Sequence, residues 1–250
     1  MATQMKARIS FLTLFFLASS LVFTSCDDDD DKEEPTPSTT TDTTPDGIPN
    51  IPGADGAIIA IETVTPTDTP LGPFEIVLGT GVAVFYDTNL VFQNAGNVSL
   101  NGNDLTRNSN NSYIYIPTAT EIYGIEFNGT VDWAVEGSGD VPGFSGSPSF
   151  DFPSIGTLSG DNTVDRSQDY SYSVSGVSGA DSIIYNINGL IKTQTGNETT
   201  VTFTADELSS LASGAGVIQA TPYRMESQDF SGKTIYFVNE KVVTMSVTIQ

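Results

Sequence analysis

The chain has 250 residues, with 31 aspartates and glutamates against 9 lysines and arginines, no histidine and one cysteine, so its formal net charge is −22. The lack of histidine excludes Ser-His-Asp and Cys-His triads and most zinc sites. Such an acidic chain is also a poor partner for nucleic acid, because it has no basic patch to replace the counterions of the phosphates.

The first 25 residues have the pattern of a secretory signal peptide. Lys6 and Arg8 precede an apolar run from Ile9 to Phe23, which is shorter than the roughly 20 residues that a membrane-spanning helix needs. A basic start, a short apolar run and small residues before a cleavage point are the parts of such a peptide. We therefore expect residues 1–25 to be removed and exclude them from the fold.

The sequence Phe23-Thr24-Ser25-Cys26 resembles a bacterial lipobox, in which the cysteine is lipidated and becomes the first residue of the mature chain. The acidic run after Cys26 resembles the surface-export signal of lipoproteins in the Bacteroidota. This resemblance implies a lipid such as palmitate on Cys26 and a position on the outer face of the outer membrane. Its export signal would consist of Asp27, Asp28, Asp29, Asp30 and Asp31.

Residues 26–56 are rich in proline, threonine, aspartate and glycine, a composition that favours an extended, disordered tether. Within it, Asp42-Thr43-Thr44 resembles the O-glycosylation motif of the same phylum, as does Asp181-Ser182-Ile183 further on. The resemblance implies modification at Thr43 and at Ser182.

From residue 57 onward, apolar and polar residues alternate in short segments, which is typical of half-buried antiparallel strands. Clusters of glycine, asparagine, proline and serine separate these segments, as expected for turns. The clearest expected strands are IVLGTGVAVFYD, SYIYIP, IYGIEF, VDWAVE, YSYSVS, DSIIYNI, VTFTA, VIQATPY, TIYFV and VTMSVTI.

This length and strand spacing favour two β-sandwiches, at residues 57–152 and 153–250, with a single larger sandwich or barrel as the alternative. Residues 200–223 resemble a passage between two strands of bacterial Ig-like domains. The resemblance implies an all-β fold of two tandem Ig-like β-sandwich domains after the signal peptide and tether. Thr204 and Glu207 have the spacing of a capping box, which predicts one helical turn.

Glycan binding by such a sandwich requires exposed aromatic rings. Tyr113 and Tyr115 share one face of an expected strand and are the candidates for a two-ring platform. Trp133 shares a face with Val131 and Val135, which predicts that it packs in a core.

Two acidic segments are candidates for calcium binding, although neither has the spacing of an EF-hand loop, and turn formation is the alternative for both. Their oxygen-bearing residues are Asp161, Asn162, Asp165 and Asp169 in one, and Asp46, Asn50 and Asp55 in the other.

Asp132 and Glu136 are the clearest carboxylate pair for hydrolysis. On one strand they would lie roughly 13 Å apart, and glycosidases need at most about 9.5 Å. The pair therefore does not predict an enzyme.

The sequence thus predicts a non-enzymatic lipoprotein of the outer-membrane surface, held to the membrane by its lipid. We expect it to bind or scaffold an extracellular glycan or protein and not nucleic acid. A pilin-like structural subunit is the alternative, and a carboxylate-based hydrolase is a remote one. No cofactor is expected apart from Ca²⁺ at the acidic segments.

Overall fold

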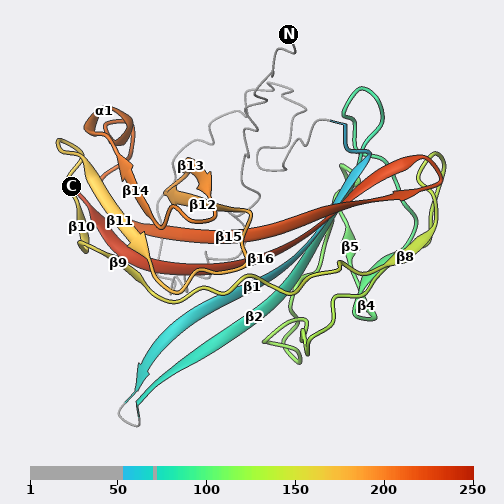
Figure 1. Cartoon of the computed structure of the whole chain (residues 1–250), viewed down its shortest axis with the longest axis horizontal. Coiled ribbons are helices and arrows are strands. Elements are labelled where there is room, and N and C mark those ends of the chain that lie inside the picture. Colours follow the sequence, from blue (N-terminus) through green and yellow to red (C-terminus); the bar gives the residue numbers. More distant parts are fainter. Residues whose placement is uncertain (1–52, 70–71) are drawn as a thin grey trace, which may run out of the picture. The chain divides into compact units, whose positions relative to one another are not determined.

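The computed structural model of the chain describes residues 53–69 and 72–250. These residues form an all-β protein with several sheets and one helical turn. Residues 51–250 group into one compact unit. Figure 1 shows the long strands β1, β2, β15 and β16 that connect its parts.

The largest sheet in the described residues has the strand order β13, β12, β15, β16, β1, β2, β6, β5, and β10 also pairs with β16. Its strands are β1 (Gly56–Thr69), β2 (Gly72–Phe85), β5 (Thr106–Arg107), β6 (Tyr113–Ile114), β10 (Thr163–Val164), β12 (Ser182–Ile187), β13 (Leu190–Thr195), β15 (Gly214–Phe230) and β16 (Lys233–Ile249).

Two smaller sheets, with the orders β14, β11, β9 and β4, β3, β7, β8, complete the described strands. Their strands are β3 (Val98–Leu100), β4 (Asn103–Asp104), β7 (Trp133–Val135), β8 (Phe144–Gly146), β9 (Leu158–Gly160), β11 (Tyr170–Val174) and β14 (Thr200–Phe203). The helical turn α1 (Ala205–Leu208) begins at the predicted capping box, in which Thr204 and Glu207 bond reciprocally.

The β15–β16 hairpin closes through Ser231 and Gly232, whose φ angles of 55° and 81° fit a type I′ turn. Each strand has 17 residues, which is long enough to reach two separate cores. β16 also pairs in parallel with β1, from Gly56 opposite Ile235 to Val64 opposite Val243. The start of the folded unit is therefore paired with its end.

Two apolar clusters form the cores. One combines residues between Ile58 and Phe144 with Ile235 and Phe237, and the other extends from Val164 to Ile249. Their boundary lies close to the expected joint, but β16 contributes side chains to both clusters. The division into two tandem Ig-like domains therefore stays a prediction. The predicted core position of Trp133 is confirmed.

Candidate functional site

An open hollow of about 480 Å³ lies beside the β3–β4 turn. It is lined by Asn101, Asn103, Thr120, Glu121, Ile122, Tyr123, Gly124 and Glu126. Ile122 and Tyr123 are 61% and 57% exposed, although both are large and apolar in character. Exposed apolar groups beside converging polar ones are typical of a binding surface. We call this feature the Tyr123 hollow.

The loop that carries Ile122 and Tyr123 is fixed to β2 by a contact between two glycines. Gly79 N donates a hydrogen bond to Tyr123 O, and Ile125 N donates one to Gly79 O, both at 2.9 Å. A Cβ atom on Gly79 would lie 1.8 Å from Ile125 O. A Cβ atom on Gly124, whose φ is +70°, would lie 2.0 Å from Gly79 O. Both positions therefore require glycine.

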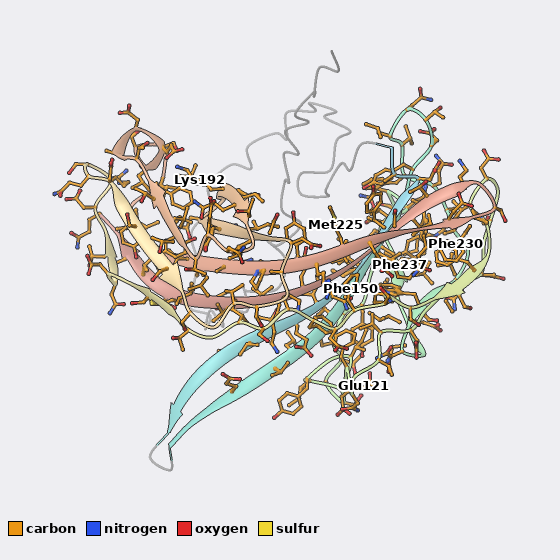
Figure 2. The ribbon with its side chains drawn as sticks, viewed as in Figure 1. Glu121, Phe150, Lys192, Met225, Phe230 and Phe237 are labelled. Atoms are coloured by element: carbon orange, nitrogen blue, oxygen red, sulfur yellow. The ribbon has the colours of Figure 1, made fainter. Side chains whose placement is uncertain are left out.

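Tyr115 holds the same loop from the interior. Its hydroxyl donates a hydrogen bond to Glu121 Oε2 at 2.7 Å. Burial, with the hydrogen bond and charge of Glu121, raises the pKa of Tyr115 to about 12, so the phenol stays a donor at neutral pH. Ile125, two residues after Tyr123 in the chain, is buried. The loop thus presents Tyr123 on a fixed support. In Figure 2, Glu121 lies among the loops at one end of the molecule, and Lys192 of β13 lies at the other end.

Asn101 builds one wall of the hollow. It begins the turn between β3 and β4, with φ angles of 48° for Asn101 and 76° for Gly102. Its Nδ2 donates to Glu126 O at 3.1 Å and to Thr130 O at 3.0 Å. Its Oδ1 accepts from Asp132 N at 2.7 Å. Since these bonds use the whole amide, Asn101 positions the wall and offers little to a ligand.

Asn103 and Glu126 provide the acceptors that remain open. Asn103 Nδ2 donates to Leu100 O and Asn101 O, at 3.3 and 3.1 Å, whereas its Oδ1 has no partner among the described residues. The Glu126 carboxylate accepts one long bond of 3.3 Å, from Asn128 Nδ2. The hollow therefore combines an aromatic ring with oxygen acceptors, and its lining contains no lysine or arginine.

The expected platform of Tyr113 and Tyr115 is wrong, because the two rings are only 1% and 6% exposed. The Tyr113 hydroxyl lies inside, where it accepts a hydrogen bond from Ala95 N at 2.8 Å. The opposite face of this segment points outward, and Ile116 is 56% exposed. Alternation separates the two faces of a strand but does not say which one is buried, since tyrosine and isoleucine both suit a core.

The residues expected to carry the lipid, the export signal and the first O-glycan, namely Cys26, Asp27 to Asp31 and Thr43, lie outside the described residues. Ser182 is half-buried in β12, which is paired on both sides, with β13 and β15. Modification at Ser182 stays a prediction.

Asp46 and Asn50, two of the candidate calcium ligands, lie outside the described residues. Asp55, Asp165 and Asp169 bond to other groups of the protein. Asp165 Oδ1 accepts from Ser167 N at 2.9 Å, and Asp169 Oδ1 accepts from Ala205 N at 2.9 Å. Asp55 forms an ion pair of 2.9 Å with Lys233. In the described part of the chain, no three acidic residues gather as a metal site would require.

Asp132 and Glu136 also have local roles. Asp132 Oδ1 accepts from Ser147 Oγ at 2.6 Å, and Glu136 Oε2 accepts from Asn97 N at 2.9 Å. Neither carboxylate lines the Tyr123 hollow.

Sequence reasoning missed Ile122 and Tyr123 because it placed both in the expected strand IYGIEF. That expectation is wrong: the segment forms turns, with an isolated bridge between Gly124 and Gly79. Gly124 was the signal that could have corrected it, since a glycine inside a strand pattern often marks a close backbone approach.

The described residues thus form an all-β protein with an open hollow beside an exposed tyrosine, and none of their helices is long and apolar enough to cross a membrane. No known family matches the chain, and no curated protein matches it.

Among solved structures, the chain is similar to SGBP-B of the Bacteroides ovatus mixed-linkage glucan utilization locus, solved in complex with a mixed-linkage heptasaccharide. The identity is 19% and the TM-score is 0.22. The match covers 68% of this chain and 42% of that one, so this chain spans less than half the length of that protein. At this TM-score, the likeness carries no argument about this protein.

Proposed function

We propose that the protein is a lipid-anchored protein of the outer bacterial surface that binds a glycan in the Tyr123 hollow without modifying it. The observation that carries the proposal is the pairing of Tyr123 with the open acceptors of Asn103 and Glu126. In this proposal, Cys26 carries the lipid and residues 26–56 form the tether, as the N-terminal sequence predicts.

The chemistry of the hollow suits a sugar. A pyranose ring has an apolar face of C–H groups that packs on an aromatic ring, and hydroxyls at its edge that donate hydrogen bonds. Tyr123 provides the ring, and Asn103 and Glu126 provide the acceptors. The loop is already fixed by Gly79 and Tyr115, so little conformational entropy is lost on binding.

Titration calorimetry with soluble oligosaccharides tests the site. Tyr123→Ala should weaken binding about tenfold, because it removes the apolar surface on which the sugar face would pack, and losing roughly 50–60 Å² of buried apolar area costs about 1.4 kcal/mol. Asn103→Ala should weaken it as well. Val91→Ala is the matched control, since Val91 is 57% exposed and does not line the hollow. Undiminished binding by Tyr123→Ala would remove this site from the proposal.

Catalysis is tested by incubating the same oligosaccharides with the protein and analysing their length. We expect no cleavage. If the protein cleaves the oligosaccharides and Glu126→Gln abolishes this cleavage, the protein is a hydrolase and the proposed binding function is wrong.

Anchoring is tested in cells by Cys26→Ala, which should release the protein from the membrane fraction. Retention of this variant in the membrane fraction would contradict the lipid anchor at Cys26. It would not bear on the proposed glycan site.

A further inference from the structure

The two glutamates that line the Tyr123 hollow keep acceptor atoms that the rest of the described chain does not use. Glu121 Oε2 accepts a hydrogen bond from the Tyr115 hydroxyl at 2.7 Å, and Glu126 Oε2 accepts one from Asn128 Nδ2 at 3.3 Å. The Oε1 atom of each carboxylate accepts no hydrogen bond from the described residues. Because an ionised carboxylate can accept about four hydrogen bonds, most of the capacity of this pair stays open.

No cationic side chain balances these two carboxylates within the hollow, since its lining contains no lysine or arginine. The lysines of the described residues all form ion pairs elsewhere: Lys192 with Glu207, Lys233 with Asp55, and Lys241 with Glu62. The hollow therefore leaves a place for a positive charge that a ligand can provide.

The side-chain amides of the lining have no donor left for a ligand. Asn101 Nδ2 and Asn103 Nδ2 each donate two hydrogen bonds to backbone carbonyls. An amide nitrogen has two protons, so both amides are fully used as donors. The hydroxyls of Thr120 and Tyr123 are the remaining polar groups among the lining side chains besides the glutamates, and each can donate or accept. The lining side chains thus favour a ligand that donates hydrogen bonds.

The size of the hollow fits an organic ligand. Its volume of about 480 Å³ lies within the range of pockets that hold small molecules. Tyr123 adds a ring that is 57% exposed, and a bare metal ion would leave this ring unused. The ligand that fits best combines an apolar face with a positive charge.

We infer, on the basis of the proposed glycan binding, that the glycan in the Tyr123 hollow carries free amino groups, which donate hydrogen bonds to Glu121 and Glu126. An ammonium group has three donors and a positive charge. Hydrogen bonds between ionised partners are roughly twice as strong as those between neutral ones. The net charge of −22 also attracts such a glycan and repels one that is rich in carboxylate or sulfate groups.

Titration calorimetry with oligosaccharides of glucosamine, N-acetylglucosamine and glucose tests the class of glycan. At the same linkage and length, these ligands differ only in the substituent of the second carbon. The glucosamine oligosaccharide should bind about three- to tenfold more tightly than the other two, because each exposed ion pair contributes modestly. Raising the ionic strength from about 0.1 M to about 1 M should remove most of this preference, because the screening length falls from about 10 Å to about 3 Å.

Glutamine variants test whether the preference comes from the hollow. Glu121→Gln keeps an oxygen that can accept from the Tyr115 hydroxyl, so the loop stays fixed. Glu121→Gln and Glu126→Gln should each weaken binding of the glucosamine oligosaccharide about two- to fivefold and leave binding of the glucose oligosaccharide nearly unchanged. Glu198→Gln is the matched control, since Glu198 is exposed and does not line the hollow. An equal effect of Glu198→Gln would overturn the inference, because the preference would then come from the overall charge.

The outcomes separate this inference from the proposed function. If all three oligosaccharides bind equally and Tyr123→Ala weakens them all, the amino-sugar preference is wrong and the glycan site stands. If Tyr123→Ala changes the binding of none of them, the glycan site itself is wrong.

A short oligolysine peptide tests whether positive charge alone is sufficient. We expect it to bind more weakly than the glucosamine oligosaccharide, with an affinity that Tyr123→Ala leaves unchanged. If the peptide instead binds as tightly and depends on Tyr123 and Glu121 in the same way, the occupant is a basic protein segment and the inference is wrong.

Discussion

Replacing Gly124 by alanine should destabilise the protein far more than its small added volume suggests. The φ of +70° is unfavourable for alanine by about 1–2 kcal/mol. The new Cβ atom would lie 2.0 Å from Gly79 O, so the loop must move away from β2. That movement breaks the two hydrogen bonds made by Gly79, which contribute about 0.5–1.5 kcal/mol each. With partial exposure of Ile125, we expect a total loss of about 3–5 kcal/mol.

Two other glycines separate the conformational effect from the steric one. Gly102 and Gly129 have similar φ angles of +76° and +80°, but a Cβ atom on either would have no atom within 4 Å. Alanine at these positions should therefore cost only about 1–2 kcal/mol, the conformational part alone.

Urea unfolding followed by tryptophan fluorescence provides the assay, because Trp133 is the only tryptophan of the chain and is buried. A lower midpoint at an unchanged m value reports lost stability. Gly124→Ala should also weaken glycan binding, since its loop carries Tyr123. Equal destabilisation by Gly124→Ala and Gly102→Ala would refute the role of the close contact between Gly79 and Gly124.

Three further predictions concern ionisation and capping. Burial raises the pKa of Glu240 to about 7, so the folded state keeps a proton that the unfolded state releases above pH 4.5. The free energy of unfolding should therefore fall by about 3 kcal/mol as the pH rises from 4.5 to 7 and above. Glu240→Gln should flatten this pH dependence in urea unfolding. Burial alone would raise the pKa of Asp55, but the hydrogen bonds from Lys233 and Thr234 lower it below its usual value. Asp55→Asn should therefore lower the free energy of unfolding by about 0.5–1 kcal/mol at pH 7. This difference should disappear in acid, because protonation of Asp55 has then already weakened its ion pair with Lys233 in the unmutated protein. Thr204→Ala should cost about 1 kcal/mol in the same assay, because it removes the cap of α1.

Several elements could be predicted from the sequence because they depend on neighbours along the chain. The alternation around Trp133 predicts a strand with the tryptophan inside, and the spacing of Thr204 and Glu207 predicts a capped helical turn. Both patterns depend on backbone geometry within a few residues.

The candidate site could not be predicted in this way. Tyr123 and its neighbours alternate like a strand, yet the contact between Gly124 and Gly79 turns them into a loop. The two glycines are 45 residues apart (124 − 79), and no local pattern records that they meet. The sequence likewise could not predict that Tyr113 and Tyr115 are buried, because the two faces of their strand have similar hydrophobicity.

The sequence by itself determined the all-β class, the acidic character and the exclusion of histidine and thiol chemistry in the folded unit, because composition and short-range alternation carry that information. Only the tertiary structure decided that β1 pairs in parallel with β16, that one long hairpin serves both cores, and that Tyr123 is the exposed ring. Pairing between distant strands depends on which apolar faces can be buried together, and that is a property of the whole chain.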